Sequence, residues 1–279
     1  MANYTAADIK ALRERTGAGM MDVKKALDEA DGNAEKALEI IRVKGLKGVS
    51  KREGRSASDG LVAAHVADDA AGQTGTLIEL NSETDFVAKS PVFVALADKV
   101  LAAAVAAGTQ DVEAILASVV DGSTVADTIQ ETAATLGEKL VLRRVARISA
   151  PAVTVYLHKV NKDLPPQVGV LVGSDAAAAA VAKDVAMHIA AYSPSYLTRD
   201  DVPAETVASE RRIAEETSRN EGKPEAALPK IVEGRLTGFF KESVLVDQAF
   251  AKDQKKSVGQ VVTETGGAVT GFARFRVGA

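Results

Sequence analysis

A faint internal repeat constrains the fold of this chain more than any other feature of its sequence. The first unit has two apolar runs that predict strands and then a helical pattern: 61–66, 76–80 and 91–107. The second unit has the same order: 153–160, 168–172 and about 175–192. We therefore expect an α+β fold with two related α/β core subdomains on small antiparallel sheets, spanning residues 56–150 and 151–279.

The connection from strand to helix differs between the two units. It is residues 173–174 in the second unit and residues 81–90 in the first, where compact domains use about 2–6 residues. Because the second unit closes with the short connection, the long one is not needed for the fold. It places Phe86 where polar turn residues are expected, just before a helix start at Ser90 and Pro91. We interpret Phe86 as a wedge displayed for a partner.

Residues 1–45 have the pattern of three short helices. Thr5 to Asp8 form a capping-box start for the first helix, residues 16–19 break it, and the second helix is predicted over residues 20–30. The third helix carries an apolar stripe and is expected to end at Gly45. We predict a small three-helix domain with its linker over residues 1–55, of a size that folds marginally.

Residues 42–55, at the end of the third predicted helix and beyond it, contain six cationic residues and one acidic residue, Glu53. The cations are Arg42, Lys44, Lys47, Lys51, Arg52 and Arg55. We interpret residues 42–55 as a solvated linker with a basic face, and RNA contact is the alternative. The net charge of the whole chain is −4, so nucleic acid is not the partner that we expect.

A helical hairpin is predicted over residues 204–241. Its first helix, 204–220, is dense in charge, and the returning helix has an apolar stripe: Leu228, Ile231, Val232, Leu236, Phe239 and Phe240. Such a pair can project and mediate a homodimer, or it can pack on its own core, and both interpretations stay open. Further predicted elements are two helices and a final strand that completes a sheet: 112–120, 125–136 and 268–277.

The sequence has no motif of catalysis or metal binding. It has no cysteine, no phosphate-binding glycine loop and no dinucleotide-binding glycine motif. The three histidines lie in separate elements, and we interpret His188 as a half-buried structural histidine. We therefore predict no catalytic residue, no metal and no cofactor. Without a signal-peptide pattern or an apolar run of about 20 residues, we expect a cytoplasmic protein that does not enter a membrane.

Several motifs in a fixed order carry a resemblance to a known family. They are Leu12-Arg13-Glu14-Arg15-Thr16, Gly17-Ala18-Gly19-Met20-Met21-Asp22, Lys24-Lys25-Ala26-Leu27, Glu83-Thr84-Asp85-Phe86-Val87-Ala88-Lys89, Arg143-Arg144-Val145-Ala146, His188-Ile189-Ala190-Ala191, Gly222-Lys223-Pro224, Val232-Glu233-Gly234-Arg235 and Val258-Gly259-Gln260. With these, the chain closely resembles the elongation factor Ts family, the bacterial guanine-nucleotide exchange factors for elongation factor Tu. The resemblance runs almost end to end.

The resemblance implies an N-terminal domain like the ubiquitin-associated domain, two related core subdomains and a coiled-coil hairpin used for dimerisation in some members. It also implies that the segment containing Phe86 enters the nucleotide-binding domain of elongation factor Tu near its magnesium site. The partner-binding residues implied by position are Thr84, Asp85, Phe86, Val87 and Ala88, with Met20, Met21 and the region of His188 as further candidates.

Two other classes of function stay open. The chain could be an RNA-binding translation protein that acts through residues 42–55. It could also be an enzyme with an unrecognised site, although the missing motifs argue against this. The function that we expect is nucleotide exchange on elongation factor Tu without catalysis by the chain itself.

Overall fold

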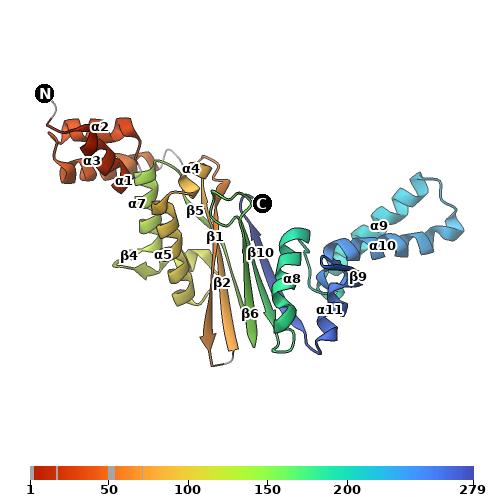
Figure 1. Ribbon diagram of the computed structural model, residues 1–279. Helices are drawn as coiled ribbons and strands as arrows, with labels where there is room; N and C mark the ends of the chain where they lie inside the picture. Colours follow the sequence, from red (N-terminus) through yellow and green to blue (C-terminus); the bar gives the residue numbers. More distant parts are fainter. Residues whose placement is uncertain (1–2, 17, 50–53, 71) are drawn as a thin grey trace.

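Two three-stranded antiparallel sheets lie at the centre of the fold (Figure 1). The computed structural model describes residues 3–16, 18–49, 54–70 and 72–279. Sheet 1 has the order β1-β2-β5, with bounds Asp59–Asp69, Gly72–Ser82 and Val141–Ala150. Sheet 2 has the order β6-β7-β10, with bounds Ala152–His158, Val168–Ser174 and Val269–Arg276. The predicted α+β class is confirmed, and each repeat unit contributes one sheet.

The hairpin of β1 and β2 is longer than the sequence predicts. The apolar runs predict strands over residues 61–66 and 76–80 only, but pairing runs from Asp59 opposite Ser82 to Asp69 opposite Gly72. The prediction failed because the polar residues at this end satisfy one another: Gln73 donates to Asp68 at 3.0 Å and Thr74 to Asp69 at 2.8 Å. The polar residues therefore indicate that this end of the hairpin is exposed to solvent, and they do not indicate where its strands end.

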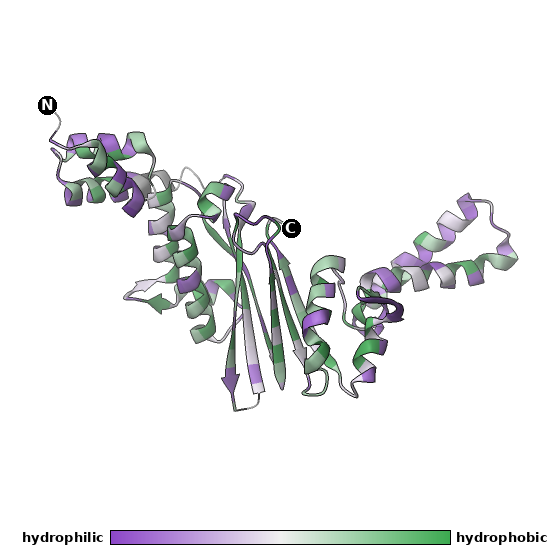
Figure 2. Ribbon diagram, viewed as in Figure 1, coloured by the Kyte–Doolittle hydropathy of each residue, from purple (hydrophilic) through white to green (hydrophobic). Residues whose placement is uncertain are grey.

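The two sheets share an apolar layer. It contains Val62, Leu77, Ala146, Ala150, Val153, Leu171 and Phe275. Close approach of the sheets depends on glycine, since a Cβ atom on Gly75 would lie 2.7 Å from Val153 Cγ1 and one on Gly169 would lie 2.7 Å from Leu77 Cδ1. Figure 2 shows the apolar residues of the central strands in green. The apolar layer between the sheets therefore joins the two repeat units.

Helices cover the outer face of each sheet (Figure 1). On sheet 1 they are α5, α6 and α7, with bounds Pro91–Ala107, Val112–Ala117 and Val125–Leu136. On sheet 2 they are α8 and α11, with bounds Ala179–Tyr192 and Val258–Glu264. The predicted helix 112–120 ends early because the β-branched Val119 and Val120 pair with β4 instead.

The remaining short elements connect these layers. They are β3 Val119–Val120, β4 Ser123–Thr124, β8 Ala249–Phe250, β9 Asp253–Ser257 and 3-10 turns at Arg199–Asp201, Glu225–Ala227 and Leu245–Asp247. The final strand, β10, pairs with β7 and completes sheet 2, as predicted. In the described ranges, no helix combines the length and apolarity needed to cross a membrane.

Three helices precede the sheets. They are α1 Ala6–Thr16, α2 Met20–Glu29 and α3 Ala34–Val49, and they enclose a small core that includes Leu12, Val23, Leu27 and Ile41. The predicted capping box is confirmed, because the Asp8 carboxylate accepts from the Thr5 amide at 2.7 Å and the Thr5 hydroxyl accepts from the Asp8 amide at 3.3 Å.

The prediction that Gly45 ends the third helix is wrong. The helix continues to Val49, so the first part of the expected linker is helical. A glycine inside a helix costs about 1 kcal/mol, and tertiary packing outweighs this here because α3 lies along α7. Arg42 forms an ion pair with Glu131 of α7 at 2.9 Å. Lys51 and Arg52 lie outside the described residues.

Two helices extend away from sheet 2, drawn in cyan and light blue at the right of Figure 1. They are α9 Ala204–Asn220 and α10 Leu228–Ser243. They pack on each other around Ala214, Val232 and Leu236, with Phe240 beside this cluster. Arg–Glu pairs such as Arg235 with Glu221, at 2.7 Å, join the two segments. The pair thus has a small core of its own, and self-association through it stays a prediction.

A buried carboxylate links the two sheets. Glu79 of β2 is 0% exposed, and its side chain accepts from Arg144 Nε at 2.6 Å, Asn81 Nδ2 at 3.2 Å and the Gly278 amide at 3.2 Å. Arg144 also lies 4.4 Å from the centre of the Phe275 ring and donates to the Arg276 carbonyl at 3.0 Å. This network therefore ties β2 and β5 of sheet 1 to the end of β10.

We predict that Arg144→Ala lowers the free energy of unfolding by about 3 kcal/mol. That is the lower end of the range for breaking a buried ion pair, and we use it because Arg144 is itself partly exposed. Urea denaturation measures the change. Arg212→Ala is the matched control, since Arg212 forms an exposed pair with Glu216 and should cost less than about 1 kcal/mol. Equal losses in both variants would contradict this account of Glu79.

Candidate functional site

The segment between β2 and α5, residues 83–90, is called the Phe86 loop below. It contains a four-residue helix, α4 Asp85–Ala88. Thr84 is the N-cap of α4, and its hydroxyl accepts from the Val87 amide at 3.4 Å. Ser90 is the N-cap of α5 and accepts from the Phe93 amide at 3.2 Å, so the helix start predicted there is confirmed. The loop is a structured helical turn.

Phe86 is displayed at the surface by this turn. It is 72% exposed, the largest exposed fraction among the large apolar residues of the described ranges. Val87 packs against the core of sheet 1, and Ala88 is buried in it. The ammonium of Lys89 lies 4.5 Å from the centre of the Phe86 ring. The turn thus packs Val87 and Ala88 against the core and exposes Phe86, the bulkiest of the three apolar side chains, to solvent.

Two carboxylates hold the base of the Phe86 loop. Glu138 Oε2 accepts from the amides of Glu83 and Thr84, each at 3.0 Å, and Glu138 Oε1 accepts from the Thr84 hydroxyl at 2.6 Å. In return, Glu83 Oε1 accepts from the Lys139 amide at 2.7 Å. Each carboxylate therefore binds backbone of the segment that carries the other, and we call this pair the carboxylate brace.

The brace also reaches the end of the N-terminal linker. Arg55 forms an ion pair with Glu83 at 3.2 Å, and Lys139 Nζ donates to the Arg55 carbonyl at 3.1 Å. Residues from three separate parts of the sequence thus meet at the start of α4. Charge-assisted hydrogen bonds of this kind are stronger than neutral ones, so the base of the loop is fixed more firmly than a four-residue helix could fix itself.

The predicted site residues fall into two groups. Thr84, Asp85, Phe86 and Val87 lie together on the Phe86 loop, all at least partly exposed. Met20 and Met21 lie on α2 and are 58% and 62% exposed, while the neighbouring Val23 is buried. These two methionines form an apolar patch of the three-helix unit, separate in sequence and in secondary structure from the loop.

Two predicted contact residues are not displayed. Ala88 is 1% exposed and His188 is 0% exposed, so in this structure neither side chain can face a partner. The short helix α4 turns Ala88 into the core of sheet 1. Gln248, Phe250 and Tyr192 enclose the imidazole of His188. A role of these two positions in partner binding stays a prediction. The exposed large side chains of α8 are instead Met187 and Tyr192.

His188 is a fully buried structural residue rather than a half-buried one. Its Nδ1 accepts from the Ala251 amide at 3.2 Å, so Nε2 carries the proton and donates to Gln248 Oε1 at 2.8 Å. The ring stacks on Tyr192 with centroids 4.6 Å apart. Burial lowers the pKa of His188 below the ordinary 6.5, although the hydrogen bond to Gln248 partly opposes this.

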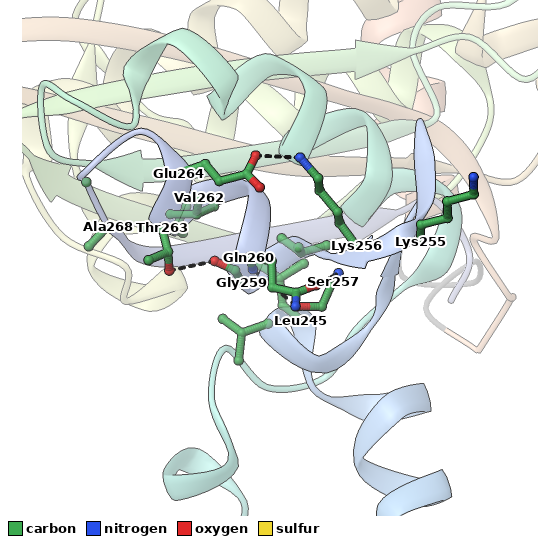
Figure 3. Close-up of a pocket in the computed structure, with 14 residues that line it drawn as sticks. Leu245, Lys255, Lys256, Ser257, Gly259, Gln260, Val262, Thr263, Glu264 and Ala268 are labelled. Carbon is green, nitrogen blue, oxygen red and sulfur yellow. Dashed lines mark hydrogen bonds and ion pairs between the residues drawn. The ribbon is translucent and has the colours of Figure 1, made fainter.

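A cavity of about 810 Å³ lies elsewhere, around α11 on sheet 2 (Figure 3). Its wall contains the pair Lys256–Glu264, at 2.7 Å, and the apolar side chains of Leu245 and Val262. No residue of the Phe86 loop lines it. Among the described residues, no group of His, Cys, Asp or Glu side chains is arranged to hold a metal ion.

Sequence reasoning missed Glu138 and Glu83 as parts of the site. Glu138 lies 54 residues from Thr84, so no local pattern connects them. The repeat is the one sequence feature that relates Glu138 to the site. Glu138 follows Gly137, the glycine that ends α7, and so lies just before the third strand of its unit. Only the fold brings that position next to the end of β2.

The candidate site is therefore a displayed apolar side chain, Phe86, on a turn whose base is held by the carboxylate brace. Residues 83–279 match the family described as Elongation factor TS. Proteins named Elongation factor Ts from Beutenbergia cavernae, Micrococcus luteus and Renibacterium salmoninarum are 73%, 68% and 66% identical to this chain, over 100% of both sequences.

The chain belongs to the elongation factor Ts family, and the resemblance drawn from its motifs is confirmed. Membership implies nucleotide exchange on elongation factor Tu during translation elongation.

The burial of His188 predicts a pH dependence of stability. Its pKa is lowered in the folded state, so the unfolded chain binds more protons once the pH falls to about 6.5. The free energy of unfolding should therefore decrease as the pH is lowered from about 7.5 to 5.5. Urea denaturation across this range measures the slope, which should be smaller in His188→Gln. An unchanged slope in that variant would contradict the assignment.

Proposed function

We propose that this chain is a guanine-nucleotide exchange factor that binds elongation factor Tu carrying GDP and promotes GDP release. It does so by inserting residues 84–87 near the magnesium site of that partner. The observation that carries the proposal is the 72% exposure of Phe86 on a turn whose base is fixed. Thr84, Asp85 and Val87 are the neighbours of Phe86 on the same turn. Met20 and Met21 supply a second apolar contact from α2.

Burial of Phe86 in the partner would contribute roughly 1.5–3 kcal/mol, or about ten- to a hundredfold in affinity. Tight binding alone does not speed nucleotide release. The coupling between factor and GDP is reciprocal, so the factor weakens GDP only as much as GDP weakens the factor. The contact made by Phe86 must therefore favour the nucleotide-free form of the partner.

Displacing the elements that hold Mg²⁺ supplies this preference. The metal neutralises the phosphates, and its loss weakens nucleotide binding. A rigid wedge is suited to this task because a mobile side chain would adapt to either form of the partner. Asp85 stands in the first turn of α4, where its negative charge is favourable to the helix. It is also partly exposed beside Phe86, so it can compete for a polar group near the metal.

The same proposal gives roles to the other parts of the chain. Residues 1–55 form a ubiquitin-associated-like domain, and residues 56–150 and 151–279 form the two core subdomains. The helices within residues 204–241 form a hairpin that can mediate a homodimer. The chain acts by binding, without a catalytic residue or cofactor of its own, and it works in the cytoplasm with other translation factors.

The rival proposal of RNA binding through residues 42–55 loses support from the ion pairs of this segment. Arg42, Lys44 and Arg55 each pair with a carboxylate of the chain, on Glu131, Glu29 and Glu83 respectively. Paired cations release fewer counterions from a nucleic acid and so contribute less affinity.

Stopped-flow release of a fluorescent GDP analogue from elongation factor Tu tests the proposed function. The wild-type chain should accelerate release, and no acceleration would contradict the proposal. Phe86→Ala should reduce the accelerated rate by about ten- to a hundredfold, because the variant loses the contact that distinguishes the two forms of the partner.

Val119→Ala is the matched control for Phe86→Ala. Val119 is an apolar residue of the same core subdomain, is 68% exposed and lies in β3, outside the Phe86 loop. Its truncation should leave the accelerated rate within about twofold of wild type, and both variants should unfold at the wild-type denaturant concentration within error. A loss of exchange in Val119→Ala equal to that in Phe86→Ala would argue against a specific wedge.

A further inference from the structure

The two repeat units brace the end of their central strand in related ways. Glu83 directly follows β2 and accepts from the Lys139 amide at 2.7 Å, just before the third strand of its sheet. Asp175 directly follows β7 and accepts from the Ala268 amide at 2.8 Å, just before the third strand of sheet 2. In both units, therefore, a carboxylate after the central strand binds the backbone just before the third strand. Because both units share it, we assign this half of the brace to the stability of the fold.

The other half of the brace exists in one unit only. In the first unit α7 ends at the left-handed Gly137, and the next residue is Glu138. In the second unit α11 is followed by the left-handed Gly266, and the corresponding next residue is Gly267. There is no room for a side chain at Gly267, since a Cβ atom would lie 2.4 Å from Asp175 Oδ1. The fold thus closes without a carboxylate at this position.

Glu138 occurs in the unit that contains the Phe86 loop, the segment that the second unit lacks. The three hydrogen bonds of its carboxylate all end on Glu83 and Thr84, directly before α4. A helix of four residues has no stability of its own, so its orientation is set by what holds its first residues. The direction in which Phe86 points is therefore set by Glu138 at the start of α4, together with the burial of Val87 and Ala88 on its far side.

We propose that Glu138 is a positioning residue for nucleotide exchange, which orients Phe86 by binding the start of α4. This inference rests on the proposed function of the Phe86 loop. It assigns Glu138 no contact with the partner. Its effect on exchange passes entirely through the orientation of the loop, so it should vanish when Phe86 is absent.

Three substitutions at Glu138 separate geometry from charge. Glu138→Gln keeps a carbonyl oxygen for the two amides and a polar group beside the Thr84 hydroxyl, so exchange should stay within about threefold of wild type. Glu138→Asp keeps the charge but shortens the side chain by one methylene, and Glu138→Ala removes all three bonds. Both should lower the maximal rate of stimulated GDP release by roughly tenfold or more.

The same stopped-flow assay with saturating factor measures these rates, and hydrogen exchange of the Thr84 amide reports the brace directly. That amide should exchange faster in Glu138→Ala and Glu138→Asp but remain protected in Glu138→Gln. In a Phe86→Ala background, Glu138→Ala should cause no further loss of rate.

Asp175→Ala is the matched control. It removes a carboxylate that also bridges two backbone segments, accepting from Ala178 and Ala268 at 2.8 Å each, but it lies in the unit without the extra segment. It should lower stability as much as Glu138→Ala does and leave the maximal rate within about twofold of wild type. If Glu138→Ala does not fold, the pair of Glu138→Gln and Glu138→Asp carries the test.

Three results would overturn the inference. One is a normal rate in Glu138→Asp or Glu138→Ala while Phe86→Ala is impaired, which would leave the proposed function intact. Another is a loss in Glu138→Gln with a normal rate in Glu138→Asp, which would indicate that the charge itself contacts the partner. The third is a full additional loss from Glu138→Ala in the Phe86→Ala background. Absence of stimulation by the wild-type chain would overturn the proposed function, and this inference with it.

Discussion

The reciprocal binding of Glu83 and Glu138 to backbone amides is the interaction on which the display of Phe86 depends. Exposing a phenylalanine is unfavourable, and a flexible loop would fold the ring back onto the nearest apolar surface. The chain prevents this by anchoring both ends of a short turn. Glu138 holds the start of α4, and Val87 and Ala88 bury its far side in the core of sheet 1. Burial of Val87 and Ala88 in this core thus offsets the unfavourable exposure of Phe86, a side chain that does not contribute to the core.

Beyond the core that supports the loop, sheet 1 packs on sheet 2 of the other repeat unit. The sheets meet through one apolar layer, with glycines at the points of closest approach, and the buried Glu79 connects β2 to the end of β10. Because β2 leads directly into the Phe86 loop, the loop stands on a rigid double sheet. Rigidity matters for the proposed mechanism, since a wedge can discriminate between two forms of a partner only if it does not adapt to both.

The sequence was informative wherever local pattern decides structure. Helices α7 and α9 have the bounds that periodicity predicts. The connection that contains Phe86 is the longer one, as predicted, but the two connections are residues 83–90 and 175–178 rather than 81–90 and 173–174, because β2 and β7 continue to Ser82 and Ser174. Predictions failed where tertiary contacts outweigh local preference. The helix α3 continues past Gly45 because it packs on α7. Strands β1 and β2 extend into a polar segment because their residues pair across the hairpin. The burial of His188 and Ala88 and the role of Glu138 depend on residues far away in the sequence, so no local pattern reveals them.

We propose that Phe86 contributes preference between two states of the partner more than it contributes affinity for either. Isothermal titration of wild type and Phe86→Ala with nucleotide-free and with GDP-bound elongation factor Tu measures both contributions. Phe86→Ala should lose roughly ten- to a hundredfold in affinity for the nucleotide-free partner and much less for the GDP-bound partner, so the ratio of the two affinities falls. An equal loss for both forms, with an unchanged ratio, would contradict it.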